Sequence, residues 1–210
     1  MKKIICHICE QEKENNLLLH EQTHQKLEDQ NRIITSLENK IDFIVNLLNE
    51  QHNPQIQTYK RFDLYQFGGI DWIVIEQKDN KLLLLSKYIL EAKTYNDTRT
   101  SIPWGNCTLR DYLNIDFYNR FSDKDKKKIA KTTDNIFLLD TDEVLSYFTN
   151  KSEIKAVNKD TGEASRWWLS SFGINDSSAA YVCEEGRVRL GGDYVDNIFG
   201  VRPALWIEFG

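Results

Sequence analysis

The first 52 residues contain no glycine, proline or tryptophan, whereas all five tryptophans and all ten glycines of this 210-residue chain lie after Tyr59. The first part is rich in Leu, Ile, Glu, Gln, Asn and Lys, and so lacks the residues that interrupt a helix. This division predicts an extended helix followed by a globular domain. A globular part of about 150 residues buries roughly 70% of the surface of its unfolded chain, which is enough for an independent core.

Four residues near the start have the spacing of a metal site. Cys6 and Cys9 are separated by two residues, and His20 and His24 are one helical turn apart, which gives the pattern C-x2-C-x10-H-x3-H. Two thiolates on a tight turn and two imidazoles on one helix face can surround a zinc ion. The alternative is that these are unconnected surface side chains, but the combined spacing favours zinc as a bound cofactor.

Residues 6–24 resemble the two-cysteine, two-histidine zinc-finger family, with Leu17 at the position of the family's core leucine. The resemblance implies a small zinc knot over residues 1–24. The segment that would contact DNA bases carries Glu10, Glu12 and Glu14, which phosphate would repel, so we expect a structural knot.

A heptad pattern follows, which predicts a coiled-coil stalk over residues 25–53 that ends before Pro54. The alternative is an amphipathic helix lying on the globular domain, but the apolar stripe is narrow and its surroundings are polar. The pattern fits a homo-oligomer, either a dimer, a trimer or a tetramer, and we favour a trimer. Positions a are Leu27, Ile34, Ile41 and Leu48, and positions d are Gln30, Leu37, Ile44 and Gln51.

Charge and hydropathy exclude several classes of function. The net charge of −5 argues against a nucleic-acid partner, because phosphate contacts need clustered Lys and Arg. No apolar stretch approaches the roughly 20 residues that span a bilayer, and the apolar run at the N-terminus is too short for a signal peptide. We therefore expect no membrane insertion, and a cytoplasmic or virion-associated location.

After a linker at residues 54–60, residues 61–210 alternate short strand patterns with two helix patterns, which predicts an α+β domain. Residues 62–67, 71–76, 81–86, 167–169, 180–183, 187–190 and 204–207 are the predicted strands. One helix is expected at residues 107–113, capped by Thr108, and another after a capping box formed by Asp140 and Glu143.

Several segments of this domain resemble a widespread bacterial and phage domain of unknown function, recognised by WWLRSPG and GVRPAL signatures. Here they read Trp167-Trp168-Leu169 and Gly200-Val201-Arg202-Pro203-Ala204-Leu205, together with Cys107-Thr108-Leu109-Arg110, and the match spans residues 61–210. The resemblance implies a C-type-lectin-like fold of the superfamily that includes formylglycine-generating enzymes, phage tropism determinants and the variable proteins of diversity-generating retroelements.

Between these framework segments lies a set of polar and aromatic residues of the kinds that recognition surfaces use. Ordinary polar turns explain the same composition equally well. As candidates for binding a protein or glycan ligand we take Phe172, Asn175, Asp176, Ser178, Arg187, Arg189, Asp193, Tyr194, Asp196, Asn197 and Phe199.

An enzyme is not expected, because all four histidines lie before Pro54, outside the globular domain. A formylglycine-generating type of oxidase needs a reactive cysteine pair, whereas Cys107 and Cys183 fit inert core thiols. Asp193 and Asp196 are possible calcium ligands, but the sugar-binding signatures of calcium lectins are missing. We therefore expect a ligand-binding display protein, and the alternative is an adaptor that binds its partner through the zinc knot and the stalk.

Overall fold

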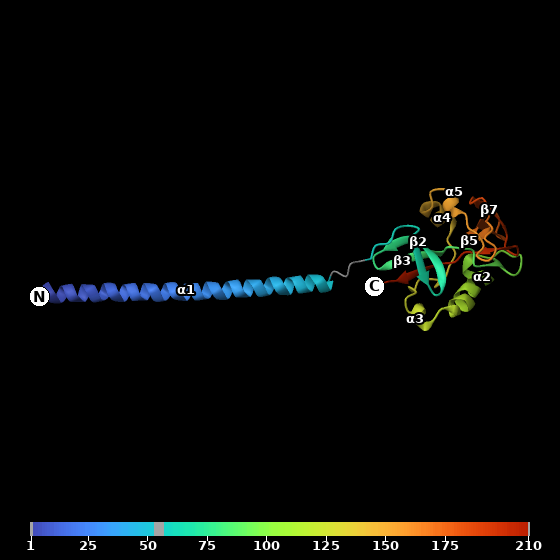
Figure 1. The fold of residues 1–210 in the computed structure, drawn as a ribbon. Helices are drawn as coiled ribbons and strands as arrows, with labels where there is room; N and C mark the ends of the chain where they lie inside the picture. Colours follow the sequence, from blue (N-terminus) through green and yellow to red (C-terminus); the bar gives the residue numbers. More distant parts are fainter. Residues whose placement is uncertain (1, 53–56, 210) are drawn as a thin grey trace. The chain divides into compact units, whose positions relative to one another are not determined.

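The computed structural model describes the backbone of residues 2–52 and 57–209 and the side chains of residues 18–45 and 57–209. The chain divides into two compact units, Met1–Ile56 and Gln57–Gly210 (Figure 1). The first unit is one long helix, α1 (Lys2–His52), as the absence of glycine and proline predicts. Among the described residues, no helix combines the length and the apolar character needed to cross a membrane.

Helix α1 passes without interruption through both the predicted knot and the predicted stalk. Its backbone is helical at Cys6 and Cys9, where the zinc-finger resemblance implies a tight turn, and the side chains of both lie outside the described residues. Residues 53–56 of the expected linker also lie outside them. The zinc site therefore remains a prediction.

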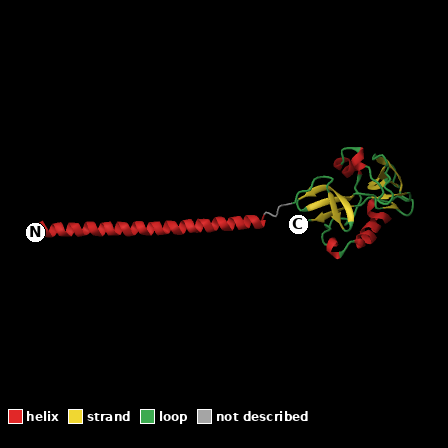
Figure 2. Cartoon of the chain, viewed as in Figure 1, coloured by secondary structure: helices red, strands yellow, loops and turns green. Residues whose placement is uncertain are grey.

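The second unit contains two sheets, which lie between short helices (Figure 2). The first sheet is antiparallel with the order β1-β2-β3-β9, and the second has the order β4-β8-β5-β6-β7, in which only β5 and β8 are parallel. This confirms the α+β class. The strands are β1 (Leu64–Phe67), β2 (Ile70–Lys78), β3 (Lys81–Ser86), β4 (Glu91–Thr94), β5 (Trp167–Phe172), β6 (Ser178–Val182), β7 (Val188–Tyr194), β8 (Ile198–Val201) and β9 (Ala204–Glu208).

The helical segments of the second unit are all short. They are η1 (Trp104–Asn106), α2 (Thr108–Tyr112), η2 (Leu113–Phe117), η3 (Tyr118–Arg120), α3 (Asp123–Lys126), α4 (Thr141–Tyr147) and α5 (Lys151–Ile154). The predicted capping box at α4 is confirmed. The Asp140 side chain accepts a hydrogen bond from the backbone N–H of Glu143, and the Glu143 side chain accepts one from the backbone N–H of Asp140. At α2 the prediction was wrong: Cys107 is the N-cap, and the Thr108 hydroxyl instead accepts a hydrogen bond from the backbone N–H of Asp97.

The core lies on both faces of the central strands. In β3, Leu82 and Leu84 contact one apolar cluster and Leu83 and Leu85 the other, because successive side chains of a strand point to opposite faces. The adjacent indoles also lie on opposite faces: Trp168 packs in the cluster of Leu82 and Leu84, and Trp167 in the cluster of Leu83 and Leu85. Both are fully buried. The tryptophan pair therefore links both halves of the core.

Arg202 is buried, with only 2% of its surface exposed. Its guanidinium donates to the carbonyl oxygens of Ser86 at 2.9 Å and Ile154 at 3.3 Å, and its Cζ lies 5.0 Å from the centre of the Trp167 ring. Burial lowers the pKa of Arg202 to about 9, because leaving water disfavours the charged form. Arg202 therefore joins β3, α5 and β5 rather than facing a ligand.

Candidate functional site

One end of the second sheet is formed by three segments that are distant in sequence: residues 95–103, 172–178 and 190–197. Backbone hydrogen bonds join them, from Asn96 to Val195 at 2.8 Å, from Val195 to Ser177 at 3.1 Å and from Ile102 to Asp176 at 3.1 Å. We call these three segments the loop cluster. Strands β5, β6 and β7 lead into the loop cluster. Its backbone is therefore held both by the hydrogen bonds between these strands and by the hydrogen bonds between the three segments.

Tyr194 is the centre of a charged and aromatic group on this cluster. The guanidinium carbon of Arg99 lies 3.8 Å from the centre of the Tyr194 ring, and Arg99 Nε donates to Asp196 Oδ1 at 2.9 Å. The same hydrogen bond raises the pKa of Arg99 and lowers that of the Asp196 carboxyl, so both remain charged around neutral pH. Tyr194 keeps 44% of its surface exposed. A partly exposed arginine stacked on a tyrosine can contact a ligand with the ring, the cation or both.

Large apolar side chains are also exposed here: 51% of Phe172 and 85% of Ile174 face solvent. The backbone next to these side chains is closely packed. Gly192 has a φ of +70°, and a Cβ at that position would come within 2.6 Å of the Ala179 carbonyl oxygen and 2.7 Å of the Gly173 Cα. The Ile174 backbone N–H also donates to the carbonyl oxygen of Gly191 at 2.9 Å. The exposed side chains are therefore presented by a well-packed backbone.

Five of the predicted ligand-binding residues are brought together and exposed, or partly exposed, on the loop cluster: Phe172, Asn175, Asp176, Tyr194 and Asp196.

Three further predicted residues shape the turns. Ser178 is buried, with 3% exposure, and its hydroxyl donates to the Asn175 carbonyl oxygen at 2.8 Å, so no ligand can reach it. Asp193 Oδ1 accepts from the Tyr194 backbone N–H at 2.8 Å and from Asn197 Nδ2 at 2.7 Å. These side chains hold the turns in place, which is the ordinary role of Ser, Asp and Asn in loops.

The remaining three lie elsewhere. Arg187 and Arg189 are exposed, but Arg187 lies directly before β7 and Arg189 lies near its start, where it pairs across the sheet with Tyr181. Phe199 belongs to β8 rather than to a loop, and its ring stacks on Trp168 with centroids 4.3 Å apart. The sequence did not predict this strand, because β8 is held by pairing with β4 and β5, which are distant in sequence.

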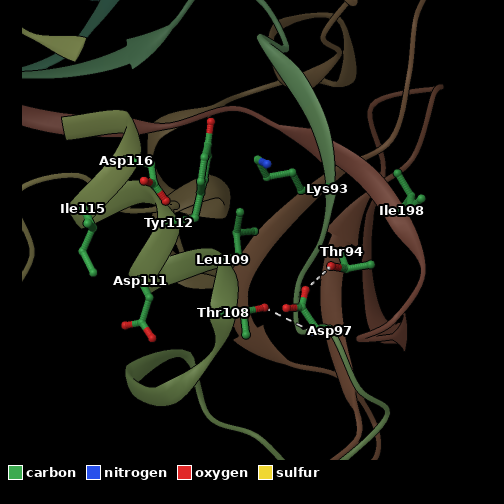
Figure 3. A pocket seen from close by; sticks show the side chains of 10 residues that line it. All are labelled: Lys93, Thr94, Asp97, Thr108, Leu109, Asp111, Tyr112, Ile115, Asp116 and Ile198. Atoms are coloured by element: carbon green, nitrogen blue, oxygen red, sulfur yellow. Dashed lines mark hydrogen bonds between the residues drawn. The ribbon is translucent and has the colours of Figure 1, made fainter. Parts of the chain in front are cut away.

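A groove that the sequence did not indicate lies between β4, α2, η2 and β8 and has a volume of about 480 Å³ (Figure 3). We call it the β4–α2 groove. Its lining comes from residues 93–97, 108–116 and 198, so no local pattern could have marked it. Figure 3 shows Tyr112 beside Lys93 at one end, and Thr108 with Asp97 at the other. The lining residues are Lys93, Thr94, Asp97, Thr108, Leu109, Asp111, Tyr112, Ile115, Asp116 and Ile198.

A polar network fixes the Tyr112 end of this groove. The Tyr112 hydroxyl donates to Glu91 at 2.7 Å and accepts from Arg120, and Lys93 Nζ lies 3.8 Å from the centre of the Tyr112 ring. Burial, and then the hydrogen bond to Glu91, raise the pKa of Tyr112, so the phenol stays protonated. Lys93 and Arg120 both lie near Glu91, at 3.8 Å and 3.4 Å, so Glu91 is the carboxylate that both cations contact.

The two cysteines of the domain are buried and not joined to each other. Burial raises the pKa of Cys107 to about 11, which keeps it a thiol at neutral pH, and the Cys183 Sγ–H donates to Glu185 at 2.8 Å. These surroundings match the expected core thiols and not a reactive pair. Within residues 18–45 and 57–209, no three His, Cys, Asp or Glu side chains gather as a metal site would require.

No curated protein and no solved structure is detectably similar to the chain. One protein family does match, in two overlapping segments at residues 79–142 and 130–209, and these together cover most of the globular domain and more than half of the chain. They include β3, Trp167, Trp168 and Arg202, which join the core. The chain therefore belongs to the family described as a domain of unknown function, DUF6273.

Proposed function

We propose that this protein is a homo-oligomeric recognition protein that binds a protein or glycan ligand through the loop cluster. The observation that carries the proposal is the Arg99–Tyr194–Asp196 group, which stands next to exposed apolar side chains on a tightly bonded backbone. Aromatic and arginine side chains contribute most of the binding energy at protein interfaces. A backbone that is already ordered loses little entropy on binding.

The exposed apolar side chains support the same proposal. Phe172 and Ile174 are two large apolar residues within three positions, and each has more than half of its surface exposed. Exposed apolar surface of this kind marks interaction sites more often than inert surface when it adjoins polar and aromatic groups. A partner that covered these side chains would remove them from water, which stabilises the complex by roughly 25 cal/mol per Å² of apolar area.

Helix α1 supports the oligomeric part of the proposal. Leu27, Ile34, Leu37, Ile41 and Ile44 follow the heptad a and d positions, and each has more than half of its surface exposed on the single helix. Copies of α1 that packed along this seam would bury these residues, as in a coiled coil. We favour a trimer. Several recognition surfaces on one stalk would strengthen a weak single-site interaction through avidity.

Two finer proposals rest on resemblance. We assign the domain to the C-type-lectin-like superfamily because its framework segments occur in the family's order. We also keep zinc as a cofactor of Cys6, Cys9, His20 and His24. In a straight helix the Cα atoms of Cys9 and His20 are about 16 Å apart along the axis, from a rise of about 1.5 Å per residue. Zinc binding by all four would therefore require the helix to turn between these residues, so that metal binding and folding would be coupled.

A phage or retroelement origin is proposed on the resemblance alone. The genomic neighbourhood tests it. A reverse transcriptase gene beside a near-copy of the 3′ end that differs at adenines supports diversification of the loop cluster, and the absence of both removes the idea.

The binding proposal is tested by capture from a lysate of the source cells. Immobilised wild-type chain and the Arg99→Ala/Tyr194→Ala variant are compared by quantitative mass spectrometry. The control is Lys87→Ala/Tyr88→Ala, because Lys87 lies over the Tyr88 ring at 5.0 Å and so provides a similar pair away from the loop cluster. We expect captured molecules that the control retains and the Arg99/Tyr194 variant loses.

The adaptor is the second candidate, and the exposed seam of α1 favours it as much as it favours self-association. Deletion of residues 1–53 separates the two. Capture that survives the Arg99/Tyr194 substitutions and is lost on this deletion supports the adaptor and overturns the recognition proposal.

A further inference from the structure

The β4–α2 groove combines an apolar floor with acidic walls. Leu109 lies at its base with 1% exposure, while Ile115 and Ile198 stand on opposite sides with 58% and 67% of their surfaces exposed (Figure 3). Ile115 comes from the helical side and Ile198 from β8, where it pairs with Thr94. The apolar part of the groove therefore lies between a helical segment and a strand.

Three carboxylates line the same groove: Asp97, Asp111 and Asp116. Within the described part of the chain, none of them lies within 4.0 Å of a basic side-chain nitrogen. Lys93 is the only cation in the lining, and its ammonium lies over the Tyr112 ring and near Glu91. The end of the groove at Thr108 and Asp97 is therefore negatively charged and has no cation of its own.

The Asp97 carboxylate is held in position. Its Oδ1 accepts from the Thr94 hydroxyl at 3.2 Å, and its backbone N–H donates to the Thr108 hydroxyl at 3.1 Å. These bonds join β4 to the start of α2 and leave the second carboxylate oxygen of Asp97 without a hydrogen bond to a described residue. A carboxylate that is already oriented loses little entropy when it accepts a hydrogen bond from a charged donor, and this favours binding of that donor.

We propose that the β4–α2 groove binds a lysine or arginine side chain of a polypeptide partner. The methylene stem lies on Leu109 between Ile115 and Ile198, and the cationic head reaches Asp97 and Asp111. Basic side chains are suited to such a site because they bury an apolar stem while keeping the charge in a polar setting. The groove shares only Asp97 with the loop cluster and none of the residues Arg99, Tyr194 and Asp196, so this proposal does not depend on the proposed function.

Methyl NMR on the full chain tests the proposal with small probes. Ile115 and Ile198 are labelled at their δ1 methyls, and the chain is titrated with the N-acetyl methylamides of lysine, arginine, norleucine and glutamate. Norleucine has the stem without the charge, and glutamate has the opposite charge. We expect saturable shifts of both methyls with lysine and arginine, at a Kd of roughly 1–10 mM, and weaker shifts with the other two.

The double variant Asp97→Asn/Asp111→Asn provides a second test in the same titration. Asparagine keeps the hydrogen bond from Thr94 but removes the charge, so we expect binding of the lysine probe to weaken about tenfold, since two exposed ion pairs are lost. Asp142→Asn is the matched control, because Asp142 is an exposed carboxylate of α4 outside the groove, and its affinity should equal that of the wild type. The absence of saturable shifts, equal binding of norleucine or glutamate, or unchanged affinity in the double variant each overturns the proposal.

Discussion

Trp168 provides the most exacting test of how the domain is held together. Its indole is fully buried, stacks on Phe199 at 4.3 Å and meets Tyr95 edge-on at 5.8 Å. Its Nε1–H donates to the carbonyl oxygen of Lys93 in β4 at 3.0 Å. Because the side chain joins β5 to β8 and to β4 at once, its removal affects the scaffold of both the loop cluster and the β4–α2 groove.

The expected cost of Trp168→Ala is about 3–5 kcal/mol, the range for large aromatic truncations that leave a cavity. Trp168→Phe keeps a ring in the stack but removes the donor to Lys93, so we expect a smaller loss of about 1–3 kcal/mol, as for an unsatisfied buried acceptor with a partial cavity. Tyr194→Ala on the exposed loop cluster should change stability by no more than about 0.5 kcal/mol.

Urea unfolding followed by tryptophan fluorescence measures these losses selectively, because all five tryptophans lie in the C-terminal domain and none in α1. With a slope of about 2 kcal/mol per molar urea, Trp168→Ala should lower the midpoint by roughly 1.5–2.5 M. A loss below about 1 kcal/mol, or equal losses for alanine and phenylalanine, would refute the packing and hydrogen bond described for this indole.

Four further predictions concern other parts of the chain. Burial raises the pKa of Glu143, so the stability that this residue contributes is present below its unfolded pKa and is lost as pH rises through the folded value. Glutamine cannot ionise, so the stability of Glu143→Gln relative to wild type should increase as pH rises above the ordinary range of a glutamate. Glu153→Gln should show the opposite trend in the same urea titrations, because hydrogen bonds lower the Glu153 pKa, and identical trends would contradict the assignment. Ile34→Asp/Ile41→Asp should convert the oligomer to monomer in sedimentation experiments, while Ser36→Asp/Asn39→Asp should not; a monomeric wild type at tens of micromolar would rule out the stalk. The purified chain should hold about one zinc per copy, and metal analysis of Cys6→Ser/Cys9→Ser should show its loss, whereas unchanged zinc would end that claim.

Much of the framework could be predicted because it depends on local patterns. The continuous run Leu82–Leu85 has the apolar character of a strand buried on both faces, and it became the centre of the first sheet. The capping box at Asp140 and Glu143 was recognisable because both of its partners lie within one turn.

The parts that could not be predicted depend on pairing across long distances. Strands β4 and β8 are four residues each and carry no alternating pattern, and they exist because each pairs with the other. The sequence therefore did not indicate β4 or β8 as strands, and the β4–α2 groove went unseen. Arg99 was missed for the same reason, because only the fold brings it across 97 positions to Asp196.

Hydrogen–deuterium exchange of the full chain, with and without a captured ligand, tests the central claim most directly. The account predicts that the ligand slows exchange in residues 95–103, 172–178 and 190–197, where backbone bonds already join the three segments of the loop cluster. Protection confined to residues 18–45 of α1, with no change in these segments, would contradict it.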